Sequence, residues 1–178
     1  RLENGRKIME VYLTRHNLVD TIHITGSART HDAIVFGVGE EGEQHKRENQ
    51  SIMNKPISSE LGGVSPTIVV PGPWSKGDFK FQAENIATQK LQNAGHNCIA
   101  TQVLIMPKEW VGTKKLLQEV ENKIANTESR SAYYPGATDR QNAAREHANA
   151  KSLNCDVDRT IIYDVDALID EPCFTDEY

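Results

Sequence analysis

Aromatic residues are scarce in this sequence, and long apolar runs are missing from it. Only 6% of the 178 residues are Phe, Trp or Tyr, so a folded core has to rest mainly on Ile, Val, Leu and Ala. No apolar run approaches the roughly 20 residues of a membrane-spanning helix, and no signal peptide is visible. We therefore expect a cytoplasmic protein without a membrane as partner.

Basic residues are too few for a nucleic-acid-binding protein. Lys and Arg number 20 against 25 Asp and Glu, which gives a formal net charge of −5. Contact with a phosphate backbone calls for a basic face, so we expect no nucleic acid as partner. Hydrophobic residues at 38% and charged residues at 25% are typical of a globular chain with its own core.

Cysteine is rare, and neither cysteine nor histidine shows the spacing of a metal site. The three cysteines contain no Cys-x-x-Cys pair, and the six histidines contain no His-x-x-x-His pair. We therefore predict no bound metal. An odd number of cysteines also argues against a secreted disulfide scaffold and indicates a reducing compartment.

What the sequence does contain is a regular alternation of strand and helix patterns. Short apolar and β-branched runs predict strands at 20–25, 57–61, 67–70, 99–106 and 159–165, of which 67–70 is expected to be buried. Apolar residues at helical spacing predict helices at 2–15, 28–36, 76–93, 113–126 and 139–150. Such an alternation indicates an α/β fold with a largely parallel sheet and flanking helices.

The polar stretch 37–55 contains a glycine pattern that invites a functional reading. Gly37-Val-Gly39-Glu-Glu-Gly42 has the G-x-G-x-x-G spelling of a dinucleotide-binding loop. Glu40 and Glu41 would oppose a pyrophosphate, and the residues after Gly42 offer no apolar side chain to dock a helix on a sheet. We therefore predict a surface loop here, with a dinucleotide loop as the less favoured alternative.

The window 59–102 holds a carboxylate and a thiol that could act together. Glu60 stands at a strand end before Gly62 and Gly63, and Cys98 stands between a helix end and the next strand. An out-and-back strand–helix unit returns the chain to the edge where it began, so Cys98 can face Glu60. A carboxylate can take the thiol proton or activate a hydrolytic water. The alternative reading is a buried structural cysteine and a surface glutamate.

Four short motifs in this chain resemble those of the aldehyde dehydrogenase superfamily. Glu60-Leu-Gly-Gly63 followed by Ser65-Pro66, and then Asn93-x-Gly95-x-x-Cys98, look like the two signatures of the family in the right order. Ile24-Thr-Gly-Ser27 resembles the strand-turn that meets the cofactor pyrophosphate, and Glu177-Tyr178 looks like the opening of the E-x-F-G-P motif. The resemblance implies an aldehyde-dehydrogenase-like catalytic domain at 58–178, preceded at 1–57 by the C-terminal part of the dinucleotide-binding domain.

The resemblance also implies a reaction and its residues. Cys98 would be the nucleophile that forms a thiohemiacetal and then a thioester, and Glu60 the base that activates water to release the carboxylic acid. NAD or NADP would accept the hydride, with Gly26, Ser27, Leu61 and Glu177 as the cofactor-binding residues. The substrate would be a small-molecule aldehyde, and the full-length protein a homo-oligomer.

Two departures from the family pattern stand near these motifs. His96 occupies a position where the family usually has Gln or Glu, and Val64 one where it often has Lys; we favour a packing role for His96 over an effect on the thiol. Because the family is much longer than this chain, we expect the 178 residues alone to have little or no dehydrogenase activity. The alternatives are a non-catalytic relative that serves binding or assembly, and a cofactor-free thiol esterase.

Overall fold

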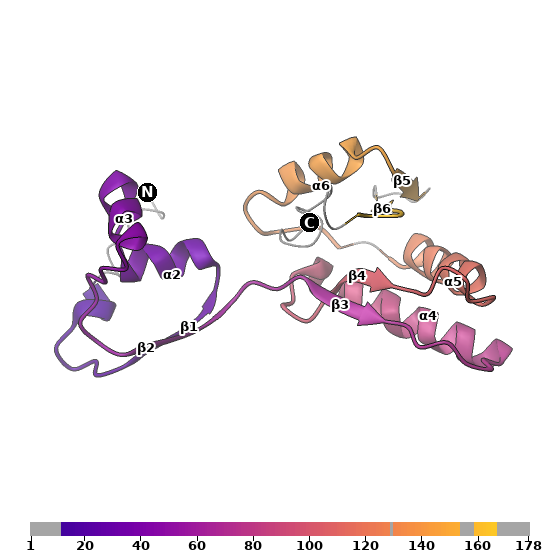
Figure 1. Ribbon diagram of the computed structural model, residues 1–178, viewed down its shortest axis with the longest axis horizontal. Coiled ribbons are helices and arrows are strands. Elements are labelled where there is room, and N and C mark those ends of the chain that lie inside the picture. Colours follow the sequence, from indigo (N-terminus) through magenta and orange to yellow (C-terminus); the bar gives the residue numbers. More distant parts are fainter. Residues whose placement is uncertain (1–11, 129, 154–158, 167–178) are drawn as a thin grey trace. The chain divides into compact units, whose positions relative to one another are not determined.

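The computed structural model describes residues 12–128, 130–153 and 159–166, and these residues form two compact units (Figure 1). The first unit is Arg1–Gly62 and the second is Gly63–Tyr178. Both units contain helices and strands, and two of the three strand pairs among the described residues are parallel. The α/β class is therefore confirmed. Along the described residues, no helix combines the length and apolar character that crossing a bilayer requires.

The first unit is built on one parallel strand pair. Strand β1 (Ile22–Gly26) pairs with β2 (Ile57–Leu61) from Ile22 opposite Ile57 to Gly26 opposite Leu61. Helix α2 (Ala28–Val35) follows β1 directly, because the Ser27 side chain accepts a 3.2 Å hydrogen bond from the Thr30 amide and caps the helix. Of the helix predicted at 2–15, residues 12–15 are helical and residues 1–11 lie outside the described part of the chain.

The surface loop predicted over the G-x-G-x-x-G stretch is wrong, because helix α3 (Gly39–Arg47) forms there. Acidic residues occupy its first turn and basic residues its last, which is the distribution that the helix dipole favours. The helix docks by polar contacts instead of apolar ones: Lys46 forms a 2.7 Å ion pair with Asp32 of α2. The glycines serve packing, since a Cβ on Gly42 would overlap the Gly37 carbonyl group.

The second unit is built on another parallel pair, β3 (Ser65–Ile68) and β4 (Thr101–Ile105), with Ile68 opposite Ile105. Helix α4 (Lys76–Leu91) and a 3₁₀ turn, η1 (Gln92–Gly95), connect the two strands. Figure 1 shows α4 and α5 (Thr113–Asn126) running beside this pair. The strand at 67–70 was expected to be buried, but only Val69 is, since Ile68 is 67% and Val70 72% exposed.

Helices α4 and α5 supply most of the core of the second unit. Ser75 and Asp78 start α4 with a capping box, and the amide of Ser75 donates a 2.6 Å bond to the Asp78 carboxylate. The helix predicted at 113–126 has these bounds in the structure. Leu116, Val120 and Ile124 repeat every fourth residue along α5, which places them on one buried face.

The last described segment departs from the predicted pattern. Helix α6 (Ala137–Glu146) ends earlier than the predicted 139–150, and β5 (Ala150–Leu153) follows it. Strand β5 pairs antiparallel with β6 (Arg159–Ile162), so this ladder is not part of a parallel sheet. The sequence Ala-Lys-Ser-Leu has little β propensity, and pairing with β6 overrides that preference.

Candidate active site

Cys98 lies in the turn between η1 and β4, and its side chain is exposed. The thiol is free, and it is therefore open to an electrophile from solvent. Cys155 and Cys173 lie outside the described residues. The first requirement of a nucleophilic role, access to the sulfur, is met.

The backbone of Cys98 packs against the glycine pair that follows Glu60. A Cβ atom on Gly63 would lie 2.5 Å from the Cys98 carbonyl oxygen, closer than such atoms come to each other. The Ser65 hydroxyl donates a 2.7 Å hydrogen bond to the same oxygen. The structure thus brings Gly63 and Ser65, which follow Glu60 in the first motif, into contact with the Cys98 turn of the second motif.

The chain enters this turn through three consecutive left-handed residues. Asn93 and Ala94 have φ of 54° and Gly95 has φ of 80°. The amide of His96 donates a 3.1 Å bond to the Asn93 carbonyl and closes the turn. Gly95 relieves the strain at its own position, whereas Asn93 and Ala94 carry a Cβ in a region that side chains resist.

Sequence reasoning missed an aromatic contact at this turn. The His96 ring lies 5.2 Å from the ring of Tyr133 and 4.7 Å from that of Tyr134. The two tyrosine rings lie 5.1 Å apart, so the three form one cluster. His96 therefore has a packing role. The local sequence does not predict this contact, because α5 lies between His96 and the two tyrosines along the chain.

The predicted residues of the first unit gather at the carboxyl end of its strand pair. Gly26 lies opposite Leu61 and Thr25 opposite Glu60, and the Gly62 amide donates a 3.0 Å bond to the Gly26 carbonyl. Ser27 follows at the N-terminus of α2. Ligands of parallel α/β folds bind at this end of the strands.

Glu60 and Cys98 belong to different units, so their proximity stays a prediction. The Glu60 side chain is exposed at the end of β2. Glu177 lies outside the described residues. The assignment of 1–57 and 58–178 to a cofactor domain and a catalytic domain also stays a prediction.

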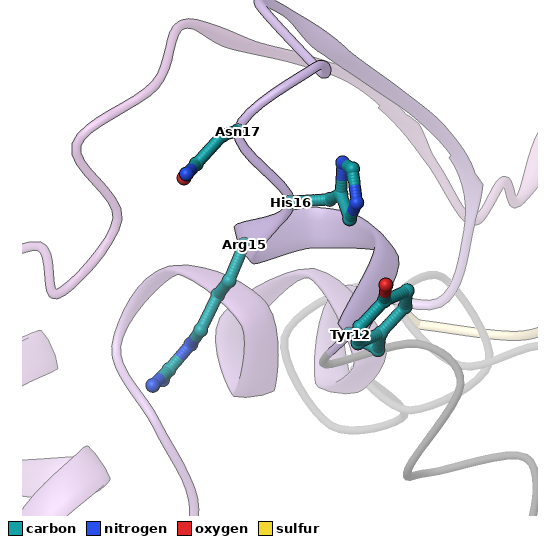
Figure 2. A pocket seen from close by; sticks show the side chains of 4 residues that line it. All are labelled: Tyr12, Arg15, His16 and Asn17. Carbon is teal, nitrogen blue, oxygen red and sulfur yellow. The ribbon is translucent and has the colours of Figure 1, made fainter.

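A pocket of about 400 Å³ is lined by none of the predicted site residues. Its walls are the side chains of Tyr12, Arg15, His16 and Asn17 (Figure 2). Figure 2 shows Tyr12 and His16 on one side of the helical turn, while Arg15 extends away from them. Because the polar groups do not converge on one point, this hollow gives no indication of a catalytic centre.

A family model for the aldehyde dehydrogenase family matches residues 3–150, which include both the Glu60 and the Cys98 motifs. The chain belongs to the aldehyde dehydrogenase family. The recognition of the family from its motifs is thereby confirmed. No curated protein matches the chain.

Solved aldehyde dehydrogenases resemble the chain in fold. An indole-3-acetaldehyde dehydrogenase in complex with NAD⁺ has a TM-score of 0.55 at 22% identity, and 80% of this chain aligns with 28% of it. A mutant of aldehyde dehydrogenase C from Pseudomonas syringae, in complex with NAD⁺ and octanal, has a TM-score of 0.55 at 18% identity over 81% of this chain and 29% of its own. Aldehyde dehydrogenase KauB from Pseudomonas aeruginosa is 28% identical, with a TM-score of 0.47, over 65% of this chain and 20% of its own. The chain thus spans less than a third of the solved structures it matches.

Proposed function

We propose that this aldehyde dehydrogenase chain carries the nucleophile and the general base for NAD- or NADP-dependent oxidation of an aldehyde to a carboxylic acid. Cys98 is the nucleophile and Glu60 the base. The observation that carries the proposal is the exposed Cys98 thiol in a turn packed against Gly63, which stands three positions after Glu60. The approach of the Glu60 carboxylate to this thiol is part of the proposal.

The two side chains have separate tasks. The Cys98 sulfur, as thiolate, bonds to the aldehyde carbon, and the carbonyl oxygen takes up a proton to give a thiohemiacetal. A nicotinamide cofactor held at Gly26 and Ser27 would supply the hydride acceptor for oxidation of this adduct to a thioester on Cys98, and the hydroxyl proton would pass to solvent. Glu60 takes a proton from a water molecule, whose oxygen then attacks the thioester carbon. The carbon–sulfur bond breaks, the acid leaves and the thiolate of Cys98 is restored.

Gly26 and Ser27 fit the phosphate end of such a cofactor. They lie between β1 and α2, where the free amides of a helix N-terminus attract a phosphate. The nearest atom to a Cβ on Gly26 would be the Ile24 side chain at 4.0 Å, so the glycine leaves open space for a close approach. Leu61, opposite Gly26 and 37% exposed, would contact the cofactor beside them. Glu177 would bind the nicotinamide ribose.

An activated ester tests both roles without a cofactor. We expect p-nitrophenyl acetate to acetylate Cys98, detected by peptide mass spectrometry, and Cys98→Ala to abolish this product. Glu60→Gln is expected to leave acylation unchanged and to slow deacylation by about 100-fold, the size of a general-base contribution. Glu41→Gln, an exposed carboxyl on α3, is the matched control. Equal deacylation by the Glu60→Gln and wild-type chains would remove Glu60 from the mechanism.

A dehydrogenase assay separates this proposal from the two alternatives when it is run on a longer protein that contains these 178 residues, where we expect aldehyde-dependent formation of NADH or NADPH. We expect the 178-residue chain alone to form little or no NADH or NADPH from an aldehyde. A thiol esterase would turn over the ester and need no nicotinamide even in a longer protein, and a binding or assembly relative would do neither. The homo-oligomer and the cytoplasmic location stay predictions; sedimentation and cell fractionation of the intact protein test them.

A further inference from the structure

The entry to the Cys98 turn needs contacts that hold it in place. Asn93 and Ala94 are both left-handed, with ψ of 38° and 28°, although neither is a glycine. Asparagine adopts this region more readily than other residues with a Cβ, whereas at Ala94 it persists only where the surroundings impose it. The side chains around Asn93 are therefore the place to look for what fixes the turn.

Tyr133 supplies two of these contacts from a distant part of the chain. The Asn93 side-chain nitrogen donates a 3.0 Å hydrogen bond to the Tyr133 hydroxyl oxygen. The Tyr133 hydroxyl in turn donates a 3.3 Å hydrogen bond to the Asn93 side-chain oxygen. Both polar atoms of the Asn93 side chain thus meet one tyrosine oxygen. A carboxamide held at both ends cannot rotate without losing a bond.

The contacts continue from Asn93 to the residue before Cys98. The same amide nitrogen of Asn93 lies 3.3 Å from the side-chain oxygen of Asn97. The ring of Tyr133 also packs edge-on against His96, which lies within the turn. Tyr133 therefore acts on the turn through Asn93 and, separately, through His96.

The far side of the turn is fixed by other residues. Ser65 holds the carbonyl of Cys98 and Gly63 packs beneath it, as described above. The thiol thus stands between one attachment to β3 and one to the segment that precedes α6. Without the second attachment, residues 93–97 would have fewer contacts that hold their left-handed backbone angles.

We propose that Tyr133 is a positioning residue for Cys98, acting through the side chain of Asn93. The inference rests on the proposed role of Cys98 as nucleophile, since it assigns Tyr133 the task of holding that nucleophile. Tyr133 is not itself placed at the reacting atoms. The chemical requirement is a hydroxyl at position 133 that both donates to and accepts from a carboxamide.

The test removes that hydroxyl and measures the turn directly. Tyr133→Phe keeps the ring on an exposed side chain, so the fold is expected to survive. Tyr134→Phe is the matched control, because its ring also packs on His96 while its hydroxyl makes no hydrogen bond to a described residue. Amide hydrogen exchange of residues 93–98 and iodoacetamide alkylation of Cys98 are followed by mass spectrometry.

We expect Tyr133→Phe to speed hydrogen exchange of 93–98 by about three- to tenfold, because the variant loses the hydrogen bonding between the Tyr133 hydroxyl and Asn93. Alkylation of Cys98 rises in the same variant because the thiol samples more open positions. Hydrogen exchange in helices α4 and α5 stays unchanged, and Tyr134→Phe exchanges like the wild type in residues 93–98. No change in 93–98, or an equal change throughout the unit, would overturn the proposal.

A double-mutant cycle tests the route through Asn93. Asn93→Gly accepts the left-handed backbone but offers no carboxamide, so adding Tyr133→Phe to it is expected to change nothing further. The same effect of Tyr133→Phe in both backgrounds would rule out Asn93 as the link. Neither measurement uses dehydrogenase or esterase turnover, so failure of the proposed function and failure of this inference give different results.

Discussion

The Ser65 hydroxyl donates a 2.7 Å hydrogen bond to the carbonyl oxygen of Cys98, which fastens the start of β3 to the backbone of the proposed nucleophile. The bond joins two motifs that are 33 residues apart. It also fixes the direction of the peptide group that follows the thiol.

Ser65→Ala is expected to loosen this attachment without unfolding the second unit. The bond is worth about 1 kcal/mol, and the free energy of unfolding should fall by that amount in urea denaturation. Ser58→Ala in β2 is the control in the other unit, where the serine contacts His23 instead. A loss well above this value would mean that Ser65 does more than hold the Cys98 carbonyl.

Gly63→Ala is expected to cost more, because its Cβ would lie 2.5 Å from the Cys98 carbonyl oxygen. Forcing a methyl group into such a contact typically destabilises a protein by about 1–3 kcal/mol. Gly77→Ala in α4 is the matched control: its Cβ would lie 3.5 Å from Ser75 Oγ, an ordinary contact. Circular dichroism during urea unfolding compares the two, and equal stability of both variants would contradict the close approach at Gly63.

Leu116→Ala is expected to destabilise the second unit most among single truncations on α5. Leu116 is fully buried in the core cluster, and truncating such a leucine costs about 2–5 kcal/mol because a cavity remains. Leu117→Ala, one position along and only partly buried, is the control and should cost less. The same denaturation experiment ranks them, and the reverse order would contradict the predicted face of α5.

The carboxylate of Glu121 on α5 is expected to make the second unit sensitive to acid. Burial raises the pKa of Glu121. Hydrogen bonds from Lys151 and Tyr163 lower this pKa by more than burial raises it, so the net pKa lies below its usual 4.5. Glu121 therefore binds a proton more readily in the unfolded chain than in the folded one. The stability that the ionised Glu121 carboxylate contributes is lost as the pH falls from 4.5 through the lowered pKa.

Unfolding experiments between neutral and acidic pH check this dependence. Glu121→Gln should flatten the decline in stability at acidic pH, whereas Glu146→Gln, an exposed carboxyl on α6, should leave it as in the wild type. Burial, together with the hydrogen bond to Glu121, also raises the pKa of Tyr163. Tyr163 should consequently ionise at a higher pH than a free tyrosine in an alkaline absorbance titration.

The fold was predictable where local signals and packing agree. Helix α5 has the bounds that its apolar spacing predicts, and α4 begins at residue 76, as predicted. Helix α3 was missed because it has no apolar residues, so it shows no apolar periodicity. Its charges favour a helix through the helix dipole instead. Strand β5 was missed because its partner β6 decides its conformation.

The site was predictable only as far as motifs reach. The Glu-Leu-Gly-Gly and Asn-x-Gly-x-x-Cys signatures identified the family, which the match over 3–150 confirms. The contact between Tyr133 and Asn93 spans 40 residues and depends on the packing of the segment after α5, so no local pattern contains it. Sequence reasoning likewise assigned the tyrosines no role at all.

The crowding at Gly63 separates two kinds of evolutionary constraint. A descendant that lost its sulfur nucleophile would still keep a carbonyl at position 98, and any side chain at position 63 would still collide with it. Backbone packing alone therefore disfavours substitution of Gly63, whether or not the protein is catalytic. We therefore expect a glycine at position 63 wherever this turn is kept, whether or not the thiol and the carboxylate are kept with it.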